Sequence, residues 1–124
     1  MNFKLFLLII GSVSLSALAQ IALKAGMSSV SVQHSTSFEN WFATLGVAAV
    51  NLQVVAGLAL YALGAVVWLL VLAKVDVSFA YPFVGLGFIL TMLLGWWWLN
   101  EPVGLTRLIG TLMVASGVFL VSRS

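Results

Sequence analysis

Residues 5–23 read LFLLIIGSVSLSALAQIAL, a run of nineteen residues without a charge. Three further uncharged runs follow, at residues 40–73, 77–100 and 108–122. A helix that crosses the hydrocarbon core of a bilayer needs about 20 apolar residues at about 1.5 Å each, and the last run reaches that length if it begins at Val103. The sequence therefore predicts an all-α membrane protein, a single domain with four transmembrane helices near residues 3–24, 54–73, 78–99 and 103–122.

The composition of the chain also separates it from most soluble proteins. Of its 124 residues, 63% are apolar and 6% are charged, whereas a soluble domain carries roughly 25% charged residues. The net charge of +2 comes from five scattered cations, which form no basic patch, so we expect no nucleic-acid partner. The absence of cysteine removes disulfides and thiolate chemistry.

Two segments near the start of the chain allow more than one interpretation. Lys4 and an apolar stretch before Ala17-Leu18-Ala19 resemble a signal peptide, but apolar residues continue through Leu23, so we expect a retained membrane helix that ends toward Gly26. Residues 27–41 are polar and rich in serine, which predicts an aqueous loop. Residues 41–53 suit either a short interfacial helix or an early extension of the second span.

The common enzyme classes need residues that this chain lacks. A Ser-His-Asp triad needs a histidine within reach of a serine and a carboxylate. The sequence has one histidine, His34, and its nearest acid is Glu39. One histidine, three separated carboxylates and no cysteine are too few ligands for a metal centre, and no glycine-rich phosphate loop is present. We therefore expect no enzymatic activity, no catalytic residue, no metal and no cofactor.

Polar residues recur every four positions in the first span, at Ser12, Ser16, Gln20 and Lys24. This spacing places them along one helical face, with a slow drift around the axis, over about 18 Å. For the serines, hydrogen bonding between helices and a polar pathway are equally good interpretations. For Gln20 and Lys24 we favour a role in substrate binding over helix contacts and a lysine that snorkels to the headgroups.

Glu101 and Arg107 flank a proline on the same side of the membrane as Lys24. They form either a solvated turn with an incidental ion pair, or a site in which Lys24 and Arg107 bind a phosphate. In the second case Glu101 orients one of the cations or meets a hydroxylated or amino group. The aromatic residues of the spans, Tyr61, Trp68 and Tyr81, more often serve packing or face lipid.

Gly110 and Gly117 lie two turns apart on the fourth span. Small residues on one face allow close helix approach, and four helices alone enclose little space, so we expect a dimer through this helix. The alternative is packing within the chain. The predicted threading leaves two cations on one side of the membrane and three on the other, which slightly favours cytoplasmic termini and also permits insertion in both orientations.

Several short motifs follow one another along the chain: AQIALKAG at residues 19–26, Ala80-Tyr81-Pro82, Asn100-Glu101-Pro102 and the helix from Gly110 to Gly117. In this order they resemble the four-helix form of the drug/metabolite transporter superfamily, which includes EamA-like and small multidrug resistance-like proteins. WLLVL at residues 68–72, Ala80-Tyr81-Pro82 and Glu101-Pro102-Val103 are similar to the small subunits of aminoarabinose-phosphoundecaprenol flippases. The resemblance covers nearly the whole chain except residues 27–53, and it implies a multi-pass protein of the bacterial inner membrane.

The resemblance also distinguishes between subfamilies. In the small multidrug resistance proteins a membrane-embedded glutamate of the first helix couples proton and cation transport, and its counterpart here is about Ser16. No predicted span holds a carboxylate, so proton exchange for a lipophilic cation lacks its central residue. Gln20 and Lys24 instead match the polar pair of the flippase-like group.

The leading hypothesis is a dimeric flippase for a polyprenyl-phosphate-linked sugar, either a homodimer or a heterodimer with a related four-helix subunit. The tail would stay among membrane lipids, Lys24 and Arg107 would bind the phosphate, and Ser16, Gln20 and Tyr81 would bind sugar hydroxyls. One alternative is efflux of small cationic or amphipathic compounds. Another is a non-transporting assembly subunit of a glycolipid enzyme or transporter, which the divergent loop at residues 28–40 suggests.

Overall fold

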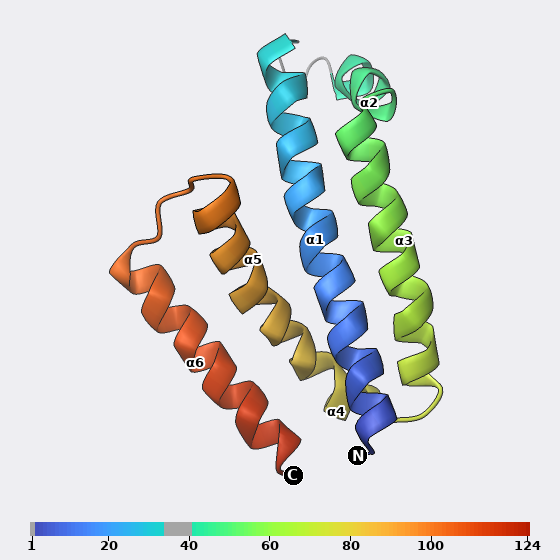
Figure 1. The fold of residues 1–124 in the computed structure, drawn as a ribbon, viewed down its shortest axis with the longest axis vertical. Helices are drawn as coiled ribbons and strands as arrows, with labels where there is room; N and C mark the ends of the chain where they lie inside the picture. Colours follow the sequence, from blue (N-terminus) through green and yellow to red (C-terminus); the bar gives the residue numbers. More distant parts are fainter. Residues whose placement is uncertain (1, 34–40) are drawn as a thin grey trace.

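The computed structural model describes residues 2–33 and 41–124, with side chains as far as Val30 in the first segment. These residues form helices and no strand. The elements are α1 (Phe3–Gln33), α2 (Trp41–Ala49), α3 (Leu52–Leu72), α4 (Val77–Ala80), the 3₁₀ helix η1 (Tyr81–Phe83), α5 (Val84–Trp98) and α6 (Leu105–Ser122). Figure 1 shows α1 beside α3 and α5 beside α6, with both termini at the same end of the molecule.

Within the described residues, four stretches are long and apolar enough to cross a membrane. They are Phe3–Val30, Leu52–Leu72, Val77–Trp98 and Leu105–Ser122, with mean hydropathies between 1.7 and 2.5. The all-α fold with four membrane spans is therefore confirmed. The third span consists of α4, η1 and α5, because Pro82 has no N–H to donate and its ring crowds the preceding turn, so the chain tightens into a 3₁₀ turn there.

The first helix is longer than the sequence predicts. An end near Gly26 and a loop from residue 27 are wrong, because α1 continues to Gln33; the rest of the predicted loop, residues 34–40, lies outside the described residues. Gly26 is buried, and a Cβ added there would lie 2.6 Å from a side-chain carbon of Val54. This glycine therefore marks a close helix contact rather than a helix end. Beyond it, Val30 is fully buried against Ala48 and Val54, which holds the extension in place.

The ambiguous segment at residues 41–53 forms a separate short helix, α2, followed by a turn. Asn51 ends this turn and caps α3, because its side-chain oxygen accepts a hydrogen bond from the Val54 N–H at 3.1 Å. The Asn51 N–H in turn donates to the Ala48 carbonyl at 3.0 Å. An asparagine with extended backbone at this position satisfies one of the free N–H groups at the helix start, so α2 and α3 are two helices rather than one.

The α1–α3 pair is the most closely packed part of the molecule. Buried Ser12 donates a hydrogen bond from its Oγ to the Gly64 carbonyl at 2.8 Å. At Gly57, a Cβ would lie 2.8 Å from Leu23 Cγ and 3.0 Å from the Leu23 backbone nitrogen. Glycines thus allow the two backbones to approach closely, as small residues commonly do between membrane helices.

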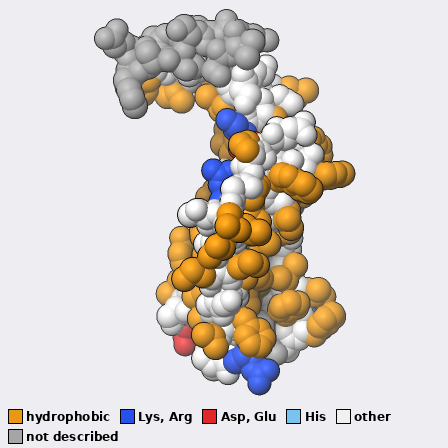
Figure 2. Space-filling view, turned by 90° about the vertical axis from the view of Figure 1, so that its left-hand side faces the viewer, with side chains coloured by type: hydrophobic (Ala, Val, Ile, Leu, Met, Phe, Trp, Pro, Cys, Tyr) orange, Lys and Arg blue, Asp and Glu red, His pale blue; other side chains and the backbone are white. Residues whose placement is uncertain are grey.

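Helix α6 lies at the periphery. Only 6% of its span is buried, against 33% for the first span, and it packs chiefly on α5 and η1 (Figure 1). Gly85 of α5 lies against Val114 and Val118 of α6. Gly110 and Gly117 have open space around them, since no described atom beyond the nearby backbone of their own helix lies within 4 Å of an added Cβ. Figure 2 views the α6 side of the molecule and shows many hydrophobic side chains on the surface below the grey residues.

Candidate functional site

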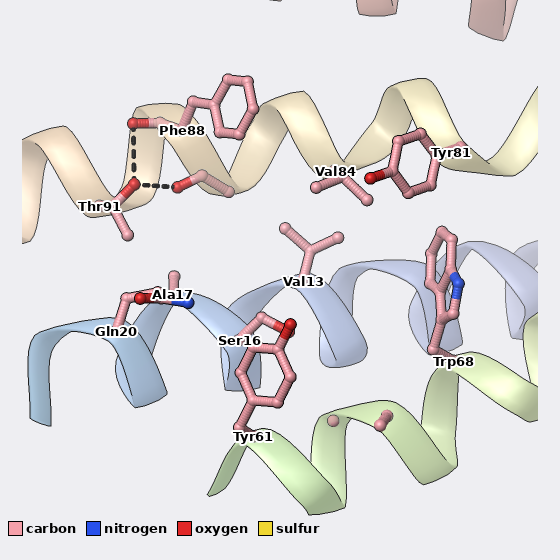
Figure 3. Close-up of a pocket in the computed structure, with 13 residues that line it drawn as sticks. Val13, Ser16, Ala17, Gln20, Tyr61, Trp68, Tyr81, Val84, Phe88 and Thr91 are labelled. Atoms are coloured by element: carbon pink, nitrogen blue, oxygen red, sulfur yellow. Dashed lines mark hydrogen bonds between the residues drawn. The ribbon is translucent and has the colours of Figure 1, made fainter. Parts of the chain in front are cut away.

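A cavity of about 360 Å³ lies between α1, α3 and the third span. Its walls come from all three spans and leave α6 out (Figure 3). The lining residues are Val13, Ser16, Ala17 and Gln20 of α1; Tyr61, Gly64, Ala65 and Trp68 of α3; and Tyr81, Val84, Gly87, Phe88 and Thr91 of the third span.

The cavity lies at the middle of the membrane-spanning helices. Ser16 is 13 residues after Phe3 and 14 before Val30, the ends of the first span. Tyr61 and Gly87 are equally central: each lies 9 or 10 residues after the start of its span and 11 before its end. At about 1.5 Å per residue, the α1 wall from Val13 to Gln20 covers about 10 Å of the roughly 30 Å hydrocarbon core.

The polar residues of α1 fall into different surroundings. Ser12 is bound to α3, whereas Ser16 and Gln20 line the cavity and make no side-chain hydrogen bond within the described part of the chain. Across the cavity, Thr91 donates to the carbonyls of its own helix, to Gly87 at 2.6 Å and to Phe88 at 3.2 Å. Ser16 and Gln20 can therefore form hydrogen bonds with a ligand in the cavity, at a depth where water is scarce.

Aromatic side chains form the other part of the wall. Figure 3 shows Trp68 and Tyr81 near one end of the cavity, Gln20 and Thr91 toward the other, and Tyr61 beside Ser16. The rings of Trp68 and Tyr81 meet edge to face, with centroids 6.5 Å apart. Tyr61 and Tyr81 keep 49% and 63% of their surfaces exposed. The cavity thus joins a hydrogen-bonding end to an aromatic end.

None of the lining residues is charged, and the predicted charged site residues lie elsewhere. Lys24 is exposed one turn beyond Gln20 on α1. The Glu101 carboxylate is half-buried against Gly95 at the end of α5. Arg107 is exposed at the start of α6 and donates to the Pro102 carbonyl at 2.9 Å. Of the predicted site residues, the cavity therefore brings together Ser16, Gln20 and Tyr81, but not Lys24, Glu101 and Arg107.

Among the described residues, Arg107 donates to the Pro102 carbonyl and forms no ion pair with Glu101. The loop from α5 to α6 begins at Asn100, whose left-handed backbone (φ 56°) is one that asparagine tolerates at a helix end. The next residue, Glu101, donates a hydrogen bond from its N–H to the Gly95 carbonyl. Within residues 2–33 and 41–124, no three His, Cys, Asp or Glu side chains gather as metal ligands would.

Sequence reasoning misses part of the lining. Tyr61, Gly64, Ala65 and Trp68 occupy positions i, i+3, i+4 and i+7 of α3, a spacing that marks one helical face. This spacing is the sequence pattern from which the aromatic wall could be predicted. From the sequence alone, we instead favour packing or lipid contact for Tyr61 and Trp68. Thr91 carries no signal of its own, because a single hydroxyl in an apolar helix commonly bonds to its own backbone.

Comparisons with known proteins relate nearly the whole chain to membrane proteins. Residues 7–122 match the family described as "Putative transmembrane family 234". A protein of Pseudomonas syringae pv. syringae named "Probable 4-amino-4-deoxy-L-arabinose-phosphoundecaprenol flippase subunit ArnE" is 42% identical over 60 residues, which are 48% of this chain and 56% of that protein. The same-named protein of Pseudomonas savastanoi pv. phaseolicola is 44% identical over 61 residues, 49% of this chain and 54% of its own.

A longer match is to the probable flippase subunit ArnF of Shewanella sediminis, 31% identical over 123 residues, which cover 93% of this chain and 85% of that protein. The matches to the two ArnE proteins span only about half of their length, and no solved structure matches the chain. With its four spanning helices, the chain is a multi-pass protein of the bacterial inner membrane. It belongs to this transmembrane family and to the family of the ArnE and ArnF flippase subunits.

Proposed function

We propose that the chain is a subunit of a flippase that moves a polyprenyl-phosphate-linked sugar across the bacterial inner membrane. The observation that carries the proposal is the mid-membrane cavity, in which Ser16 and Gln20 line the wall and have no side-chain hydrogen-bond partner among the residues that the structure describes. A sugar offers many hydroxyl groups, and each buried hydroxyl needs a partner. The names of the relatives, which specify a sugar joined to phosphoundecaprenol, support the same substrate class.

In this proposal the sugar crosses through the cavity while the prenyl tail stays in the surrounding lipid. Ser16 and Gln20 exchange hydrogen bonds with its hydroxyls, and the faces of Tyr61, Trp68 and Tyr81 cover its apolar side. The lining offers no cation, so the phosphate rests outside the cavity, where Lys24 lies about 6 Å beyond Gln20 along the helix. Glu101 contributes from the loop before α6, and Arg107 contributes from the start of α6.

The proposal includes a second subunit but no catalytic step. The relatives are named as subunits, and the exposed face of α6 suits a partner helix. That partner is a second copy or a related four-helix chain. We assign no bond-breaking chemistry to the protein, because its proposed task is to move a lipid unchanged.

The test is a flipping assay in proteoliposomes that contain the full chain, alone and together with a related four-helix subunit of the same organism. The probe is 4-amino-4-deoxy-L-arabinose-phosphoundecaprenol. We expect S16A and Q20A to slow flipping about threefold to tenfold, the effect of one lost hydrogen bond. S14A is the matched control, since Ser14 lies on the same helix but outside the lining. If neither preparation flips the probe, or S16A and Q20A behave like S14A, the proposed path is wrong.

A further inference from the structure

Helix α2 has an apolar face that the described residues, 2–33 and 41–124, leave uncovered. Trp41, Phe42 and Leu45 are 49%, 74% and 55% exposed, and the rings of Trp41 and Phe42 are stacked with centroids 3.8 Å apart. At 100° per residue these three side chains lie on one side of the helix. No residue of α2 is charged, so this side has nothing that would favour contact with water.

A second side of α2, which carries Val47 and Ala48, is held by the protein. Ala48 is buried in a small core with Val30 of α1 and Val54 of α3, and Val47 and Met27 pack against it. The junction to α3 is fixed by the Asn51 cap. Helix α2 is therefore attached firmly to the ends of α1 and α3, and its outer apolar side has a fixed direction.

The length of α1 sets the height of α2 relative to the membrane. The 31 residues of α1 extend about 46 Å, whereas the hydrocarbon core is about 30 Å thick and the bilayer with its headgroups about 40–45 Å. Lys4 and Lys24 bracket an uncharged run of hydrocarbon length. Met27 and Val30, against which α2 packs, lie about 5 to 9 Å beyond Lys24 along the helix. This is headgroup depth.

The direction of α2 agrees with this height. Figure 1 shows α2 almost along its own axis while α3 runs upright, so α2 lies across the end of the span. Its outer side continues the exposed apolar surface of α3 through Val50 and Leu52, which are 82% and 81% exposed. The surface of α3 faces lipid, and the outer side of α2 is an extension of it.

We infer that α2 is a membrane-surface helix, whose Trp41, Phe42 and Leu45 insert into the boundary between headgroups and acyl chains. Aromatic residues favour this depth, and interfacial helices bury their apolar face about 5–10 Å into it. The occupant of this surface is lipid rather than a protein. Anchored in this way, α2 holds the α1 extension upright and keeps Lys24 at the level of the lipid phosphates. The inference stands independently of the proposed flippase activity.

The absence of cysteine allows a direct test with the full chain in liposomes. Single-cysteine variants F42C and L45C carry an environment-sensitive fluorophore, and lipids carry a nitroxide either near the headgroup or at the end of the acyl chain. We expect the headgroup-level nitroxide to quench both probes at least about twofold more strongly than the deep one. Leu58 is exposed on α3, about 9 Å along the helix from its start at Leu52. A probe at L58C should therefore be quenched more strongly by the deep nitroxide than by the headgroup-level one.

K74C supplies the aqueous control, because Lys74 is an exposed charged residue in the turn between α3 and α4, and its probe should be quenched by iodide present on both sides of the membrane. The inference is overturned if iodide quenches the probes at 42 and 45 as strongly as the probe at 74, since the face then lies in water. It is equally overturned if both probes are shielded from iodide and from both lipid nitroxides, since a second copy of the chain then covers the face. Unchanged helical circular dichroism verifies that each labelled variant is folded.

Discussion

Ser12 and Ser16 stand one turn apart on α1, yet their hydroxyls have different surroundings. Ser12 is buried and donates a hydrogen bond to the Gly64 carbonyl, while the Ser16 hydroxyl lines the cavity and has no partner in the described part of the chain. We expect S12A to lower the free energy of unfolding in mixed micelles by about 0.6 kcal/mol, and at most about 1.7 kcal/mol, without slowing flipping. S16A should slow flipping without lowering stability. Equal losses of stability in both variants would contradict this division.

The same pair shows what the spacing of residues can and cannot predict. Period four identifies Ser12, Ser16, Gln20 and Lys24 as one polar series. In the structure Ser12 bonds to α3, whereas Ser16 and Gln20 line the cavity. Four residues advance a helix by about 400°, so each step turns the side chain by a further 40°. Ser12 and Lys24 therefore point about 120° apart, toward α3 and toward the outside. Which neighbour lies in each direction depends on packing, which spacing does not contain.

At the scale of elements, the α1–α3 pair depends on glycines where the helices touch. An alanine at Gly57 would place its Cβ within 3.0 Å of Leu23 backbone and side-chain atoms, and backbone atoms cannot yield without separating the helices. We expect G57A to lower the free energy of unfolding by about 1–3 kcal/mol, the usual cost of overpacking, measured by denaturant titration in micelles. G11A is the matched control, since the space at Gly11 is open; a similar loss there would disprove a contact-specific cause.

The helices themselves were largely predictable, because runs without charge define membrane spans. The end of α1 was not. Gly26 fits a helix C-terminus by local preference, but burial of Val30 against Ala48 and Val54 outweighs that preference and continues the helix. The separation of α2 from α3 follows instead from a local signal, the Asn51 cap. The glycine signal fails at the end of α1 because a core of residues distant in sequence continues the helix.

For the whole molecule, the cavity is the feature least visible in the sequence, because three spans each supply part of one wall. Ser16, Gln20 and Tyr81 were predictable as polar or motif residues. Thr91 and Gly64 acquire a role only when α3 and α5 stand opposite α1. The predicted phosphate pair, Lys24 and Arg107, does not assemble around the cavity, since α6 packs chiefly on α5 and η1. A common phosphate site for these two cations would need the second subunit or a movement of α6.

The outer face of α6 is where that second subunit is expected. Gly110 and Gly117 are exposed, two turns apart and open to at least 4 Å around an added Cβ, and close helix approach needs such small residues. We expect the double variant G110L/G117L to weaken association at least about tenfold, because two bulky side chains hold the helices apart. Energy transfer between copies labelled at an introduced cysteine in liposomes measures this, with the chain alone and with a related four-helix subunit. G11L introduces the same bulk at an open glycine of α1 and should leave association intact. Undiminished energy transfer in G110L/G117L in both preparations would show that the interface does not involve this face of α6.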